Sequence, residues 1–253
     1  MVMITKEIVD KLTTTVSAGL IGGLGAPRPG EMCIEAAICY TLGLQHGDRP
    51  TCVHQSIRGL SIALNDAKWS SNKVRADSLK NLAIAQLGTN TGFNAKLFAS
   101  RASELAIRTC VPTALRIAAS ACLSHKEELL KHANECEKLG TKEAAKAAAK
   151  AAYAATYTAS KAAYAVAKAA DAANAAAKAA DAANAVADAA NAADAILSNF
   201  AKGITDILIE MKTEGSKFLI EPKAPKFKIP EILLQKQETK HQPISKPSQK
   251  QRI

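Results

Sequence analysis

The sequence predicts an all-α protein, in which a compact multi-helix domain is followed by a long alanine-rich helix and a basic, disordered tail. Three observations lead to this prediction. Apolar residues recur at helical spacing through the first half of the chain. Glycine and proline fall between these periodic stretches. Of the 52 residues from Ala144 to Ala195, 32 are alanine, the residue with the highest helix propensity.

The first segment, residues 1–140, is expected to be a helical globular domain of six or seven short helices. We place them at about 4–20, 31–44, 54–65, 73–87, 93–110, 113–123 and 125–139. The second is apolar nearly all round and is expected at the centre of the fold. Ser70 or Ser71 is the expected N-cap of the fourth helix. Pro112 and Gly140 are expected to mark helix boundaries.

The second segment, residues 141–215, is expected to be one long alanine-rich helix. Thr141 is its expected N-cap, and Gly203 is a candidate interruption. The third segment, residues 216–253, is rich in proline and lysine and is expected to be disordered. Most of the chain's formal net charge of +10 falls in this tail.

Part of the alanine-rich segment is a decapeptide repeat, which begins at Tyr164, Asn174 and Asn184. Its polar residues are spaced by three, four and three positions, an average shorter than the helix period of 3.6. The polar stripe therefore drifts around the helix, and a coiled coil that followed the repeat would need a tighter left-handed supercoil than heptads give. A selected helix seam and simple duplication of DNA both account for the repeat.

The large apolar residues of the segment indicate a packing face of their own. On a straight helix they fall within one narrow sector, which predicts a rod that is anchored at both ends and weakly packed in its middle. The residues of this predicted packing face are Tyr153, Tyr157, Tyr164, Ile196, Phe200 and Ile207.

Two groups of residues between positions 33 and 54 could carry chemistry. Cys39, His46, Cys52 and His54 would converge on a metal ion if the loop after the second helix folded back, although their spacing fits none of the familiar zinc motifs. The alternative is that the cysteines are buried, reduced thiols. Glu35, on the mostly apolar second helix, is either buried with a raised pKa or placed at the helix edge.

The sequence leads us to assign no catalytic residue, cofactor site or metal site. The glycine-rich stretch GLIGGLG lacks the preceding strand and the Lys-Ser/Thr signature of a phosphate-binding loop, so it is expected to end the first helix. The five histidines are dispersed, and none lies in a recognisable catalytic context.

Nucleic-acid binding is an alternative that the basic residues suggest. Two helices at 54–65 and 73–87 could form a helix-turn-helix in which Lys73, Arg75 and Lys80 face phosphate. The tail is the stronger electrostatic candidate because such basic segments bind nucleic acid with little sequence preference. Its basic residues are Lys223, Lys226, Lys228, Lys236, Lys240, Lys246, Lys250 and Arg252.

The chain is expected to be cytoplasmic and not to enter a membrane. Its first 15 residues include four charged ones and form no apolar segment of the kind found in secretory signals. No stretch reaches the roughly 18–20 apolar residues that span a bilayer.

Two segments, Met32–Asp48 and Leu64–Gly88, resemble parts of uncharacterised bacterial and phage proteins that continue into alanine-rich helix. This resemblance implies no family name, activity or functional residue.

These observations predict a non-enzymatic structural or protein-interaction protein, in which the alanine-rich helix serves association with a protein partner or with a second copy. The alternatives are an accessory nucleic-acid-binding protein that uses the basic tail, and a small enzyme or metal protein centred on residues 33–54.

Overall fold

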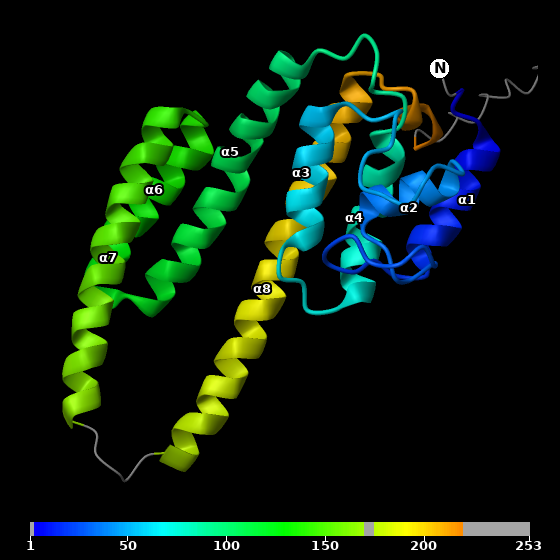
Figure 1. The fold of residues 1–253 in the computed structure, drawn as a ribbon. Helices are drawn as coiled ribbons and strands as arrows, with labels where there is room; N and C mark the ends of the chain where they lie inside the picture. The colour runs from blue at the N-terminus through cyan, green and yellow to red at the C-terminus, as the bar shows by residue number, and fades with distance from the viewer. Residues whose placement is uncertain (1–2, 170–174, 220–253) are drawn as a thin grey trace, which may run out of the picture. The chain divides into compact units, whose positions relative to one another are not determined.

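The computed structural model describes residues 3–169 and 175–219, without the side chains of residue 121 and residues 156–192. Over these residues the chain forms α-helices and no strand, so the all-α prediction is confirmed (Figure 1). The helices are α1 (Lys6–Ser17), α2 (Ile34–Thr41), α3 (Gln55–Asp66), α4 (Asn72–Ala85), α5 (Ala95–Ala121), α6 (Lys126–Leu139), α7 (Lys142–Ala169) and α8 (Ala175–Glu210), with short 3-10 helices at Leu123–His125 and Gly215–Phe218. The described residues form one compact unit. The prediction that the tail is disordered from residue 216 was wrong for residues 216–218, which belong to a 3-10 helix in which Ser216 is buried. The rest of the predicted tail, from position 220 onward, lies outside the described residues.

The helix ends follow the local chemistry that the sequence offers. The Ser71 hydroxyl accepts the N–H of Val74 at 3.2 Å and caps α4, as predicted. The Thr141 hydroxyl accepts the N–H of Ala144 at 3.3 Å near the start of α7. Gly140, with a φ of +64°, ends α6 in the left-handed conformation that glycine adopts without strain.

Pro112 does not separate two helices, and this prediction was wrong. The helix α5 runs unbroken from Ala95 to Ala121. Proline lacks an N–H group and leaves the carbonyl of Arg108 without its helical hydrogen bond. Leu115 and Ala119, on the far side of the proline, are buried against α6 and α7, and this packing holds the helix together.

The alanine-rich segment is described as two helices, α7 and α8, rather than as one, and residues 170–174 between them lie outside the described residues. Gly203 does not interrupt α8, which continues to Glu210. A Cβ atom at position 203 would lie 2.6 Å from Cδ2 of Leu105 on α5. Glycine at this position therefore lets α5 and α8 lie close together.

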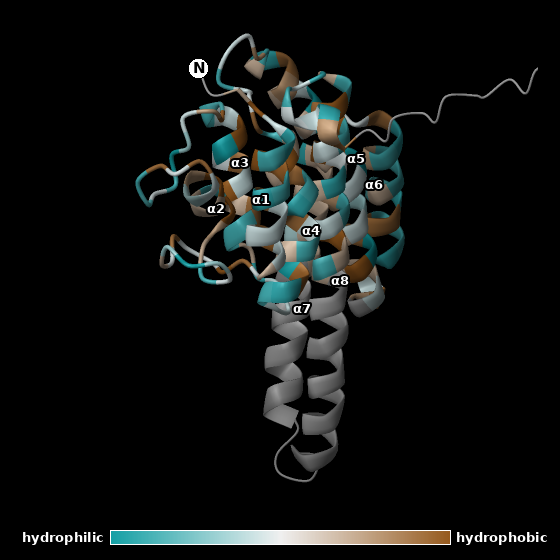
Figure 2. Cartoon of the chain, turned by 90° about the vertical axis from the view of Figure 1, so that its right-hand side faces the viewer, coloured by the Kyte–Doolittle hydropathy of each residue, from teal (hydrophilic) through white to brown (hydrophobic). Residues whose placement is uncertain are grey.

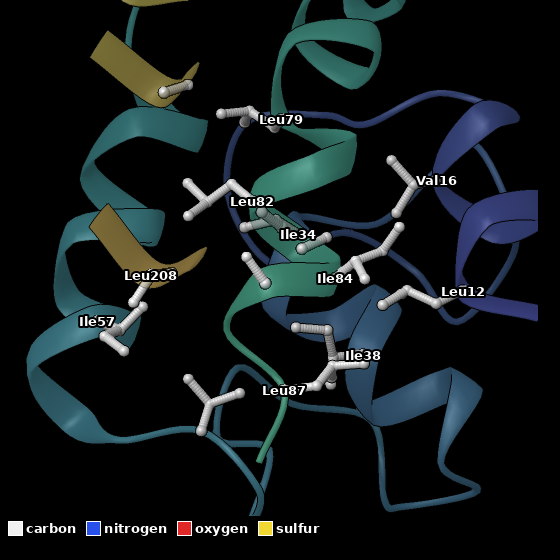
Figure 3. Close-up of a cluster of buried hydrophobic side chains, with 14 of the residues drawn as sticks. Leu12, Val16, Ile34, Ile38, Ile57, Leu79, Leu82, Ile84, Leu87 and Leu208 are labelled. Atoms are coloured by element: carbon white, nitrogen blue, oxygen red, sulfur yellow. The ribbon is translucent and has the colours of Figure 1, made fainter. Parts of the chain in front are cut away.

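The main core is formed by buried apolar side chains of α1, α2, α3, α4 and α8. Figure 3 shows its centre, which contains Leu12, Val16, Ile34, Ile38, Ile57, Leu79, Leu82, Ile84 and Leu208 of these helices and Leu87, just after α4. Residues 34–39 of α2 are all buried, which confirms the prediction that this helix is central. Figure 2 shows hydrophilic and hydrophobic residues alternating around α1, α4 and α6, as expected for amphipathic helices that cover a core.

The last turns of α8 complete the main core. Ile204 and Leu208 have no exposed surface. Beyond the helix, the Thr213 hydroxyl donates to the carbonyl of Ala85 at 2.7 Å. This hydrogen bond therefore fixes the end of the alanine-rich segment to the end of α4, which lies far from it in the sequence.

A second core lies among α5, α6 and α7, and here alanine forms the contact surface of α7. Ala144, Ala148, Ala151 and Ala155 recur at intervals of four, three and four and are all buried. They pack in one cluster with apolar side chains of α5 and α6, some larger and some also alanine. These are Ile107, Leu115, Ala119, Leu129, Ala133 and Cys136. Small side chains on both helices allow α6 and α7 to approach closely, so we call these four alanines the alanine seam.

Enlarging the alanine seam should destabilise the protein. We expect Ala148→Leu to lower the free energy of unfolding by about 1–3 kcal/mol, because a leucine forced into a packed helix interface displaces its neighbours. Ala149→Leu, the same change at the exposed neighbouring position, should alter it by about 0.5 kcal/mol or less. Urea denaturation of the two variants measures the difference, and equal effects would contradict a close contact between α6 and α7.

None of the helices in residues 3–169 and 175–219 combines the length and apolar character that a membrane crossing requires.

Candidate functional site

The most unusual chemical group in the described part of the chain is the carboxyl group of Glu35. It belongs to the first turn of α2, and its side chain has no exposed surface. Neither carboxyl oxygen has a hydrogen-bond partner among the described residues. The sequence left open whether Glu35 is buried or at the helix edge, and the structure places it inside.

The surroundings of Glu35 favour its neutral form. Burial raises the pKa of this carboxyl group from an ordinary 4.5 to about 8. Gln86 opposes this shift most strongly, followed by the positive charge of Arg58, and Ser61 adds a smaller effect in the same direction. The nearby negative charge of Asp48 adds to the increase.

Ser61 and Gln86 bond to each other, and both lie close enough to the carboxyl group of Glu35 to lower its pKa. The Ser61 hydroxyl donates to Oε1 of Gln86 at 2.9 Å. Nε2 of Gln86 is buried and has no partner among the described residues, like the two oxygens of Glu35. Three helices thus bring an acid, an amide and a hydroxyl together in the main core, and we call this group the Glu35 junction.

Sequence reasoning missed Ser61 and Gln86 as neighbours of Glu35. They lie on α3 and at the C-cap of α4, far from Glu35 along the chain. A weak signal was present, because each interrupts an apolar run of sequence, Ser61 between Leu60 and Ile62 and Gln86 between Ala85 and Leu87. Which polar residues of separate helices meet depends on how the helices pack.

The cysteines and histidines of residues 33–54 have separate structural roles. Cys33 caps α2 by accepting the N–H of Ala36 at 3.4 Å. His54 caps α3 by accepting the N–H of Ser56 at Nδ1, and Nε2 of His46 contacts the carbonyl of Gly25 at 2.9 Å. Among the described residues, no group of three or more His, Cys, Asp or Glu is placed to hold a metal ion.

The thiols around α2 are in their protonated form at neutral pH. Burial raises the pKa of Cys39 to about 11 and also raises the pKa of Cys33 and Cys52. Reactive cysteines have a lowered pKa, so these three thiols are unreactive while they remain buried.

A hollow of about 340 Å³ lies at the loop that follows α2. It is lined by Cys39 and by residues of the loop 44–51. A second hollow, of about 290 Å³, is formed by the loops 88–94 and 211–214. Among the described residues that have a buried side-chain atom without a partner, only His46 lines either hollow.

The predicted helix-turn-helix surface is only partly available to a ligand. Arg75 is 8% exposed and turns inward, where it donates to the carbonyl of Leu20 at 2.9 Å and to Oδ1 of Asn72 at 2.6 Å. This arginine therefore does not face phosphate. Lys73 is exposed but forms an ion pair with Asp77.

The predicted packing face is divided by the structure. Ile207 is buried in the main core, and Ile196 and Phe200 are half-buried. Tyr153 is 76% exposed and takes no part in the core, because the buried face of α7 is its alanine seam. Tyr157 and Tyr164 lie outside the residues whose side chains are described, as do all eight basic residues predicted for the tail.

Comparison of the chain with protein-family models, curated proteins and solved structures gives no match.

Proposed function

We propose that the protein is a non-enzymatic association protein, and that the alanine-rich segment of residues 156–192 pairs with the same segment of a second copy. The observation behind this proposal is the position of that segment between two points where the chain is fixed to the folded core. The segment is 37 residues long, and 21 of them are alanine.

The first fixed point is Ala155. The carbonyl of Ala155 lies 4.0 Å from Sγ of Cys122, at the turn that joins α5 to α6. The helix α6 has 14 residues and α7, which runs back along it, has 28, so α7 extends past the first residue of α6 by about 14 residues, or roughly 20 Å. Ala155 is the last alanine of the seam.

The second fixed point is Asp194. Its carboxylate accepts the N–H of Ser70 at 3.0 Å, just before α4 begins. Further along, Ser78 and Ser198 share a hydrogen bond of 2.7 Å, so α4 and α8 run in the same direction. The part of α8 before Asp194 therefore extends beyond the start of α4.

The chemistry of residues 156–192 suits a second copy of the chain. Alanine side chains let helices approach closely, and the alanine seam of α7 is an example of such a contact within the fold. The segment carries three lysines and three aspartates, so two copies would meet without net charge repulsion. The decapeptide repeat lies largely within this segment, so the pairing of two copies would include a coiled coil formed by the repeat.

The test is the mass of the protein in solution, measured by light scattering over a concentration series. The shortened variant lacks residues 159–169 and 175–185, which is 11 residues or about three helical turns from each helix. This deletion keeps the helical phase and both fixed points. The control is a chain that ends at position 220, which keeps the whole segment and the compact unit.

We expect the full chain and the control to have a mass above that of the 26.6 kDa monomer, and the shortened variant to be monomeric. A monomeric full chain at about 100 μM, or an oligomeric shortened variant, would overturn the proposal. The nucleic-acid interface predicted for the tail stays a prediction. The control chain tests it as well, because that chain lacks the basic residues and should lose any salt-dependent binding to DNA.

A further inference from the structure

The Glu35 junction is placed where a short helix could move. The helix α2 has eight residues and is flanked by long stretches without an α-helix, residues 18–33 and 42–54. Its neighbours α1, α3 and α4 all contact it. Because residues 34–39 are all buried, a movement of α2 must part these contacts, and the hydration of an ionised Glu35 has to offset that cost.

The charged groups around Glu35 leave an ionised carboxylate poorly compensated. The positive charge of Arg58 on α3 acts on the carboxyl group, but none of the ion pairs in the described residues includes Glu35. Asp48, in the loop after α2, is negative and opposes the ionised form. Lys11 of α1 faces the ring of Tyr40 instead. A negative charge at Glu35 would therefore need water.

Three buried thiols lie around the same junction. Cys33 and Cys39 belong to the α2 region, and Cys52 lies in the loop that follows. Their side chains are 4%, 2% and 2% exposed. The electrostatic interaction of Glu35 reaches all three, so any movement that hydrates the carboxyl group also affects these thiols.

We propose that the Glu35 junction is a proton-controlled latch: the neutral acid keeps α2 closed against α3 and α4, and loss of its proton opens α2 and exposes Cys33, Cys39 and Cys52. Opening lets water reach the carboxylate, whereas in the closed state it is fully buried and only Gln86, Arg58 and Ser61 favour its charged form. The latch makes the accessibility of the three thiols depend on pH.

The experiment measures how fast N-ethylmaleimide labels each cysteine of the full chain between pH 6.5 and 8.5, with peptide mass spectrometry to separate the sites. Cys136 is the internal reference because it is also fully buried with a raised pKa, but it lies in the second core. Dividing each rate by that of Cys136 largely removes the effect of pH on the thiols themselves. Glu35→Gln replaces the acid by an amide of the same shape that does not titrate.

In the wild-type protein we expect the relative labelling rates of Cys33, Cys39 and Cys52 to rise about tenfold or more over this range, following the ionised fraction of Glu35. In Glu35→Gln they should stay constant. Constant ratios in the wild type, or the same rise in the variant, would falsify the latch. If Glu35→Gln does not fold, amide exchange of residues 34–41 in the wild type decides, since pH-corrected protection should fall across α2 and not across α6.

Discussion

Raising the pH from 5 to 8 is expected to lower the free energy of unfolding by roughly 3 kcal/mol through Glu35 alone. The folded state holds the proton of Glu35 up to a pKa of about 8, whereas the unfolded chain releases it near 4.5. The folded state therefore binds more protons between these two values, and stability falls as the pH rises through them. Below pH 4.5 the contribution of Glu35 is fully present, and above pH 8 it is lost.

Urea denaturation of the wild type and of Glu35→Gln at each pH isolates this contribution. The difference between the two free energies of unfolding should change with pH, while the remaining titratable groups cancel. The same comparison with Glu35→Met checks that the result does not depend on the amide. A constant difference from pH 5 to 8 would show that Glu35 is ionised in the folded protein.

The second large effect is expected at Leu208, on the last turns of α8. Leu208→Ala should lower the free energy of unfolding by about 2–5 kcal/mol, because this side chain is fully buried in the main core and its loss leaves a cavity. The matched control is Leu123→Ala at a leucine that is 79% exposed, where we expect a change of about 0.5 kcal/mol or less.

Measurement by thermal and urea denaturation should give a single cooperative transition for both leucine variants. If Leu208→Ala were as mild as its control, α8 would not belong to the main core. The chain would then consist of an independent domain before residue 141 and a loosely attached alanine-rich segment, which is the division that composition alone suggests.

The position of most helices could be predicted from the sequence because local signals specify them. Ser71, Thr141 and Gly140 are caps whose chemistry acts within four residues. The central place of α2 followed from its apolar composition, which leaves no face for water.

The failures share a cause, because they depend on contacts between distant segments. The helix α5 continues past Pro112 because α6 and α7 cover it, and Gly203 lies within a helix because Leu105 approaches it. The polar neighbours of Glu35, Ser61 and Gln86, come from α3 and from the C-cap of α4. The alanine seam was not predicted at all, since periodicity in an alanine-rich stretch carries almost no contrast between buried and exposed faces.

The place of α8 in the main core has a consequence for synthesis on the ribosome. The residues of α1 and α4 emerge early, but Ile204 and Leu208, which close their core, come more than a hundred residues after α4. The second core joins helices that are neighbours in the sequence, so it can assemble as soon as α7 has emerged. The first half of the chain must therefore wait with apolar surface exposed while the middle folds, and a nascent chain halted before residue 200 should depend on chaperones for its solubility.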